Sequence, residues 1–189
     1  MSTNETALRA TTVGALKEYL KISSSDDSKD ALLEVLLDSC TAAAEKYLGR
    51  FIVAREISQE PHDFDGLKTK YLQLEQYPVI SISEILQDGI EVSSTAYRCD
   101  NYNGIIKKSV GWRGIVLATY VGGLAQDTAS VPKNIQLAVW QWIADILQTQ
   151  ESGSVKGESL GDYSVSYYDE RPIPLNVASL LEGYRRINL

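Results

Sequence analysis

VPKNIQLAVWQWIADILQTQ, residues 131–150, predicts one long helix around which the rest of the chain can be arranged. Pro132 stands where a helix tolerates proline, because the amides of the first turn have no intrahelical partner. One apolar face follows at the three-and-four spacing of a helix. Its members are Ile135, Ala138, Val139, Trp142, Ile143 and Ile146.

A second apolar set lies outside that face and consists of Leu137, Trp140, Ala144 and Leu147. With both sets apolar, the polar arc of the helix shrinks to about a quarter of its circumference. Such a helix must be covered on more than one side, first by its own domain and then by a second layer or another subunit. We favour the subunit and predict that these four residues form an oligomer interface.

Composition places the chain among soluble globular proteins, with 189 residues, 44% hydrophobic residues and a net charge of −7. The acidic balance argues against a nucleic-acid binder, which needs a basic footprint. No apolar run approaches the roughly 20 residues of a membrane span, so we expect no membrane partner and a cytoplasmic site of synthesis. Cys40 and Cys99 lie far apart and are expected to be free thiols.

The fold class that we predict is α+β, with a helical bundle core, an inserted small antiparallel β-sheet and a C-terminal helix. Thr12 is expected to cap the first helix and Gly49 to end the second. The predicted segments are a loose N-terminus at 1–12, a helical core at 13–50 and 131–150, a β insertion at 51–122, a loop or hairpin at 151–170 and a helix at 174–187.

Within the insertion, alternating and β-branched residues indicate several short strands. Two of them, Phe51–Glu60 and Lys70–Gln76, are expected on either side of a turn-rich segment at 61–66. Asp88-Gly89 is a strong hairpin signal. Another strand is expected at Ile115–Val121, and a further alternation, at residues 162–168, follows the Gly/Ser-rich segment 151–161.

A search for chemistry finds a single histidine, His62, next to Asp63 and Asp65. These three side chains are the basis of an alternative interpretation, a small metal-dependent hydrolase. The pattern lacks the further oxygen ligands of a calcium loop, and a polar hairpin turn explains it better. Gly111-Trp112-Arg113-Gly114 lacks the lysine of a phosphate-binding loop. We therefore predict no catalytic residue, no metal ligand and no cofactor.

Aromatic and basic residues near the C-terminus are candidates for protein contacts. Tyrosine brings a large contact area at little cost in rotamer entropy, which suits interfaces. The candidates are Tyr163, Tyr167, Tyr168, Tyr184, Arg185 and Arg186. The alternatives remain open: the hairpin tyrosines can cover their own sheet, and the two arginines can be a solvated helix end.

Seven segments in this order resemble the head-to-tail connector family of tailed bacteriophages, also called adaptor or head-completion proteins. The resemblance runs from Val13 to Arg186. The sheet segments at 63–70 and 101–112 are longer than in compact members. The segments are Leu16–Leu20, Glu45–Arg50, Tyr77–Ile82 with Asp88-Gly89, Thr119–Gly123, Val131-Pro132, Gly157–Val165 and Leu180–Arg186.

The resemblance implies a structural virion protein, made in the host cytoplasm and placed at the head-tail interface, with no catalytic step. It implies a single connector domain over residues 13–189 that forms a homo-oligomeric ring of twelve subunits. The ring would bind the portal protein, extend the channel through which DNA passes without specific binding, and support the next neck or tail protein. Tyr163, Tyr167, Tyr168, Tyr184, Arg185 and Arg186 would then contact the portal or neck. A stopper or terminator ring is the alternative.

Overall fold

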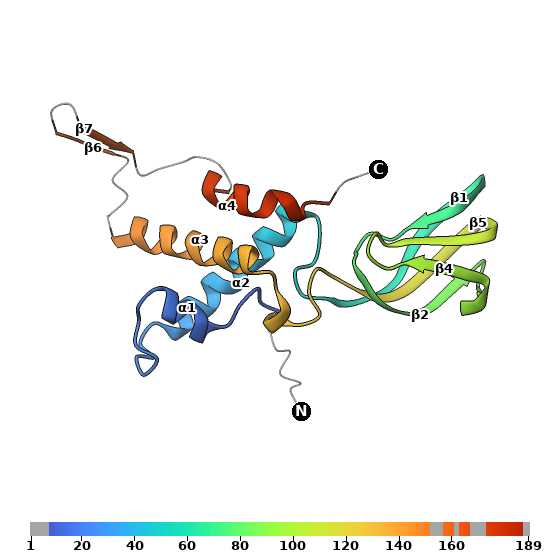
Figure 1. Cartoon of the computed structure of the whole chain (residues 1–189), viewed down its shortest axis with the longest axis horizontal. Coiled ribbons are helices and arrows are strands. Elements are labelled where there is room, and N and C mark those ends of the chain that lie inside the picture. Colours follow the sequence, from blue (N-terminus) through green and yellow to red (C-terminus); the bar gives the residue numbers. More distant parts are fainter. Residues whose placement is uncertain (1–7, 152–156, 161–162, 167–172, 187–189) are drawn as a thin grey trace. The chain divides into compact units, whose positions relative to one another are not determined.

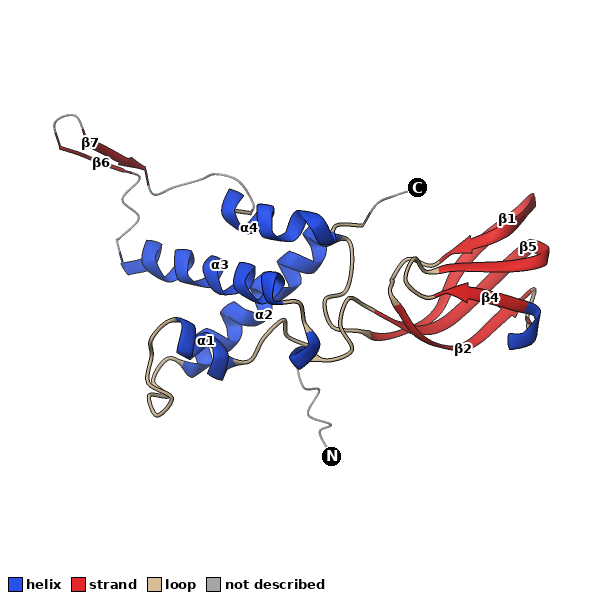
Figure 2. Ribbon diagram, viewed as in Figure 1, coloured by secondary structure: helices blue, strands red, loops and turns tan. Residues whose placement is uncertain are grey.

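The computed structural model describes residues 8–151, 157–160, 163–166 and 173–186. Its contacts divide the chain into two compact units. A helical unit combines residues before position 49 with residues after position 130, and a sheet unit spans residues 49–130. Figure 1 follows the chain by colour, and Figure 2 separates helices from strands.

The helical unit is built from α1 (Val13–Tyr19), α2 (Asp30–Leu48), α3 (Lys133–Glu151) and α4 (Leu175–Leu181), with a 3-10 turn, η3 (Glu182–Tyr184), after α4. The hydroxyl of Thr12 accepts a hydrogen bond from the Ala15 amide at 3.2 Å, which confirms the predicted cap. Gly49 follows α2 with φ +65°, the left-handed conformation expected of a residue that ends a helix. Within this unit α2 packs against α1 and α3, and α3 packs against α4.

The predicted core face of α3 is confirmed. Ile135, Ala138, Val139 and Ile143 are fully buried, and Trp142 and Ile146 are half-buried. They meet a buried stripe of α2 made of Leu33, Leu37, Cys40, Ala44 and Leu48. Burying a large aliphatic side chain contributes about 1.5–3 kcal/mol, so these residues contribute strongly to the stability of the unit.

The sheet unit contains one antiparallel sheet in the order β1-β5-β2-β3, with β4 also paired to β5. Its elements are β1 (Arg55–Gln73), β2 (Val79–Gln87), β3 (Ile90–Glu91), η1 (Ser94–Ala96), β4 (Tyr97–Asp100), β5 (Ile105–Gly122) and η2 (Thr128–Ser130). The predicted turn at Asp88-Gly89 is confirmed between β2 and β3, where both residues have positive φ.

The two strands expected on either side of residues 61–66 are in fact one strand, β1, so that prediction is wrong. Pairing with β5 continues through this segment, with Pro61 opposite Leu117 and Phe64 opposite Gly114. The pairing contains irregularities in the register, the first between Ile57 and Glu60, which accommodate the turn-like residues without ending the strand.

The prediction of a helical bundle core with a small inserted sheet is also wrong, although α+β remains the broad class. β1 and β5 have 19 and 18 residues, and the two longest helices, α2 and α3, have 19 each. The sheet unit also has its own core, in which Trp112 and Tyr120 are the largest fully buried side chains. The sheet dominates the chain because β1 and β5 bridge their turn-like residues with bulges rather than ending there.

The sheet unit is entered and left through two paired segments. The Ala54 amide donates to the Ala125 carbonyl at 2.7 Å, and the Ala125 amide donates to the Ile52 carbonyl at 2.9 Å. Gly123 lies so close that a Cβ there would clash with the backbone of Ala54. These contacts form one parallel bridge between the segment that enters the sheet unit and the segment that leaves it.

After α3, β6 (Gly157–Leu160) and β7 (Tyr163–Ser166) pair as an antiparallel hairpin, where the sequence predicts alternation at 162–168. Among the helices that the structure describes, none combines the length and the apolar character that crossing a bilayer requires.

Candidate functional site

The second apolar set of α3 is half-buried within its own chain. Leu137, Trp140, Ala144 and Leu147 all keep part of their surface exposed. Trp140 has intramolecular partners: its ring stacks on Tyr19 with centroids 5.4 Å apart, and its Nε1 donates to the Thr11 hydroxyl at 3.3 Å. Part of the second face is therefore covered by α1 and the segment before it, and an intersubunit role for the four residues stays a prediction.

A more exposed apolar stripe lies on α2. Val35 is 62% exposed and Leu32 is 40% exposed, and Ser39 and Ala42 continue the same line. The spacing of three and four residues places all four on one helix face. Because α2 is apolar around much of its circumference, its sequence alone does not single out Leu32 and Val35 as the exposed side.

Near the C-terminus, Glu182 contacts one of the candidate residues, Arg185, and also Tyr47 of α2. It accepts a hydrogen bond from the Tyr47 hydroxyl at 2.6 Å and pairs with Arg185 at 3.4 Å. The Arg185 guanidinium also lies 5.2 Å from the Tyr47 ring centroid. The hydrogen bond from Tyr47 lowers the pKa of Glu182, so this carboxylate stays charged.

The other candidates at this end differ in exposure. Arg185 is exposed, Tyr184 and Arg186 are half-buried, and the Arg186 amide donates to the Leu48 carbonyl at 2.8 Å. The backbone of Tyr163 lies in β7, but its side chain is outside the described part of the structure. Tyr167 and Tyr168 lie outside the described residues altogether.

The sheet unit buries a polar network around Glu60 that the sequence reasoning missed. Glu60 accepts hydrogen bonds from the Tyr120 hydroxyl and, at 3.0 Å, from the Glu75 amide, and His62 Nε2 lies 2.8 Å from its Oε1. The Tyr120 hydroxyl in turn accepts from the Gln76 amide at 2.9 Å. Burial opposes the charge of Glu60, but the bonds from His62, Tyr120 and the amide outweigh it and hold its pKa below the usual value.

The residues of the alternative hydrolase site are not brought together. His62 and Asp63 are neighbours in β1, so their side chains point to opposite faces of the sheet. His62 turns to Glu60, and Asp63 accepts a hydrogen bond from the Asp65 amide at 2.8 Å. Among the described residues no three His, Cys, Asp or Glu side chains are grouped as metal ligands.

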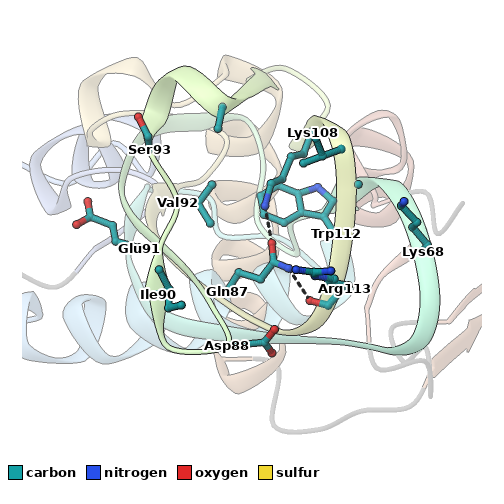
Figure 3. Close-up of a pocket in the computed structure, with 13 residues that line it drawn as sticks. Lys68, Gln87, Asp88, Ile90, Glu91, Val92, Ser93, Lys108, Trp112 and Arg113 are labelled. Atoms are coloured by element: carbon teal, nitrogen blue, oxygen red, sulfur yellow. Dashed lines mark hydrogen bonds between the residues drawn. The ribbon is translucent and has the colours of Figure 1, made fainter.

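A pocket of about 700 Å³ opens at the β2–β3 hairpin of the sheet unit (Figure 3). Trp112 and Val92 form apolar parts of its wall, and Lys68, Lys108 and Arg113 bring three cations to it. The Lys108 ammonium lies 4.7 Å from the Trp112 ring centroid and donates to Gln87. The Gln87 side chain donates in turn to the Arg113 carbonyl at 3.0 Å.

The described residues thus offer partly open apolar helix surface in one unit and a pocket lined by charged side chains in the other. The sequence profile of the head completion protein family matches residues 9–187, so the chain belongs to that family. It is a structural protein of the head-tail connector, as its sequence resemblance predicts.

Solved structures with a similar fold come from gene transfer agent (GTA) particles. A chain in the neck of the empty particle, computed with C6 symmetry, aligns with a TM-score of 0.65 and a sequence identity of 17%. A chain in the neck of the native particle, computed with C12 symmetry, aligns with a TM-score of 0.60 and a sequence identity of 17%. A chain in the virion of the native particle aligns with 0.59 at 15%. Each alignment covers 100% of this chain and 94% of the other. No curated protein matches the sequence.

Proposed function

We propose that the chain is the ring-forming adaptor of a head-tail connector, which binds the portal, extends the DNA channel and supports the next neck or tail protein. The observation that carries the proposal is the family match over residues 9–187. The similarity to chains of particle necks over the full length of this protein supports it further.

The ring is proposed to consist of copies of this chain, twelve by analogy with the neck described with C12 symmetry. Residues 13–189 act as one assembling unit, assembled in the host cytoplasm and carried in the virion. DNA passes through the ring without specific binding, in keeping with the net charge of −7. A stopper or terminator ring is the second candidate, because the similar solved chains are described only as parts of a neck or a virion.

Two surfaces are proposed to serve this role. Leu137, Trp140, Ala144 and Leu147 keep exposed surface that a neighbouring subunit would bury. Tyr184, Arg185 and Arg186 lie where the chain leaves α4 and η3 and would contact the portal or neck, together with Tyr163, Tyr167 and Tyr168.

The test compares R185E/R186E with the wild type in the strain that produces the particles. Reversing both charges is expected to abolish attachment, so that particles lack the protein and lose their DNA. The matched control is K21E/K70E, which changes the net charge equally at two exposed lysines elsewhere. DNA-filled particles that carry normal amounts of R185E/R186E would contradict the proposed contact, and purified particles without the wild-type protein would contradict the function.

A further inference from the structure

The pocket at the β2–β3 hairpin carries more positive than negative charge. Lys68, Lys108 and Arg113 line it together with two carboxylates, Asp88 and Glu91. Asp88 is already engaged within the sheet, because its Oδ1 accepts a hydrogen bond from the Ile115 amide at 2.9 Å. Figure 3 shows Lys108 next to Trp112, Arg113 next to Gln87, and Lys68 on the other side of the β5 ribbon. A pocket with cations in its lining and an apolar wall suits a protein segment that carries carboxylates.

The motif Gly111-Trp112-Arg113-Gly114 shapes this pocket. Gly111 has φ +83°, and a Cβ there would lie 3.3 Å from the Cγ of Lys68, so glycine lets the lysine stem pack over β5. Gly114 has φ +61° and leaves room for Asp88, whose carboxylate occupies the place of a Cβ. Gly111 and Gly114 therefore let Lys68 of β1 and Asp88 lie close to β5.

We propose that this pocket docks the acidic loop at residues 23–27 of a second copy of the chain. The inference rests on the proposed ring, because a closed ring joins two different surfaces of the same chain. The pocket of one subunit and the loop of the next are two such surfaces.

The loop has the charge and the rigidity that the pocket requires. Residues 23–29 are all exposed, and Asp26 and Asp27 stand side by side among serines. Asp26 accepts hydrogen bonds from the Ser28 hydroxyl at 2.6 Å and from the Ser28 amide at 3.1 Å, which lowers its pKa and keeps it charged.

The base of the loop is anchored by Lys17, whose ammonium pairs with Asp30 at 2.8 Å and reaches the Ser24 carbonyl at 3.5 Å. A segment that is ordered before binding loses less conformational entropy when it docks. Exposure, charge and order together make this loop a better occupant than a random acidic stretch of the surface.

The experiment uses charge reversal and its rescue in assembled particles. K68E/R113E reverses the charge of two cations in the pocket, and D26K/D27K reverses the charge of the loop. The quadruple variant combines all four substitutions, so pocket and loop again carry opposite charges. The matched control, K70E/R98E, places the same charge change on exposed residues of the sheet outside the pocket. Purified particles are assayed for copies of the protein by quantitative mass spectrometry, and each purified variant is checked for an unchanged melting temperature.

Each reversed pair is expected to lower incorporation at least fivefold, the control to stay within twofold of the wild type, and the quadruple variant to recover to within threefold. Normal incorporation of K68E/R113E, or an equal loss in K70E/R98E, would overturn the inference. A loss with K68E/R113E that the quadruple variant does not recover would assign the pocket to another protein and overturn the role of the second copy. Particles without the wild-type chain would instead refute the proposed function on which the inference rests.

Discussion

Replacing Tyr120 by phenylalanine tests whether the buried network around Glu60 holds the sheet unit together. The substitution keeps the fully buried ring and removes its hydroxyl, so it leaves no large cavity. Two interactions disappear, the bond donated to the Glu60 carboxylate and the bond accepted from the Gln76 amide at 2.9 Å.

The expected loss follows from these two bonds. A hydrogen bond to a charged group contributes about 1.5–3 kcal/mol and a neutral one about 1 kcal/mol. We therefore expect Tyr120→Phe to lower the free energy of unfolding of the sheet unit by about 2.5–4 kcal/mol. Tyr102→Phe is the control: that side chain is 77% exposed, so a change within about 0.5 kcal/mol is expected.

The assay is urea unfolding followed by tryptophan fluorescence. Trp112 lies in the core of the sheet unit, and the other two tryptophans, Trp140 and Trp142, belong to α3. Replacing both by phenylalanine in every variant leaves a signal that reports on the sheet unit. A loss below about 0.5 kcal/mol for Tyr120→Phe, with an unchanged urea dependence, would refute the reasoning.

Three further predictions concern single groups. The pKa of Glu60 is lowered in the folded state, so its stabilising effect is complete above the unfolded pKa of about 4.3 and is lost as the pH falls through the folded pKa. Between pH 6 and pH 3, the free energy of unfolding should therefore depend less on pH in Glu60→Gln than in the wild type. Gly114→Ala should lower the melting temperature more than Gly66→Ala, since both have positive φ but a Cβ at Gly114 also meets Asp88; equal shifts would contradict this. Burial raises the pKa of the Cys40 thiol to about 11, so a thiol reagent at pH 8 should label it at a measurable rate when the protein is unfolded in urea, and fast labelling of the native protein would contradict its burial.

The helical unit was the part most accessible to prediction from sequence, because its signals are local. The core face of α3, the cap at Thr12 and the end of α2 at Gly49 each depend on residues within a few positions of one another. The apolar surface was harder to place: α2 and α3 are both apolar around much of their circumference, and only tertiary packing decides that Val35 is exposed.

The sheet unit was harder to predict because its decisive contacts are distant in sequence. Nothing near Pro61 shows that β5 will pair through it, since the partner, Leu117, lies far along the chain. Glu60 and Tyr120, which share the buried hydrogen bond, are 60 positions apart. A bulge with positive φ at Gln59 precedes Glu60, and a bulge of this kind leaves no fixed signature in a single sequence.

The pocket illustrates the same limit for function. Lys68 comes from β1, Val92 follows β3 and Trp112 belongs to β5, so only the folded sheet brings them to one place. The glycines of the motif at residues 111–114 were visible, but their purpose depends on Lys68 and Asp88, which approach them in space.

The parallel bridge beside Ala54 and Gly123 bears on where the chain can accept changes in length. Because the bridge pairs the segments that enter and leave the sheet unit, the strands between them can lengthen or shorten while both ends of the unit stay together. Insertions and deletions between these positions are therefore expected to be tolerated better than changes in the paired segments themselves.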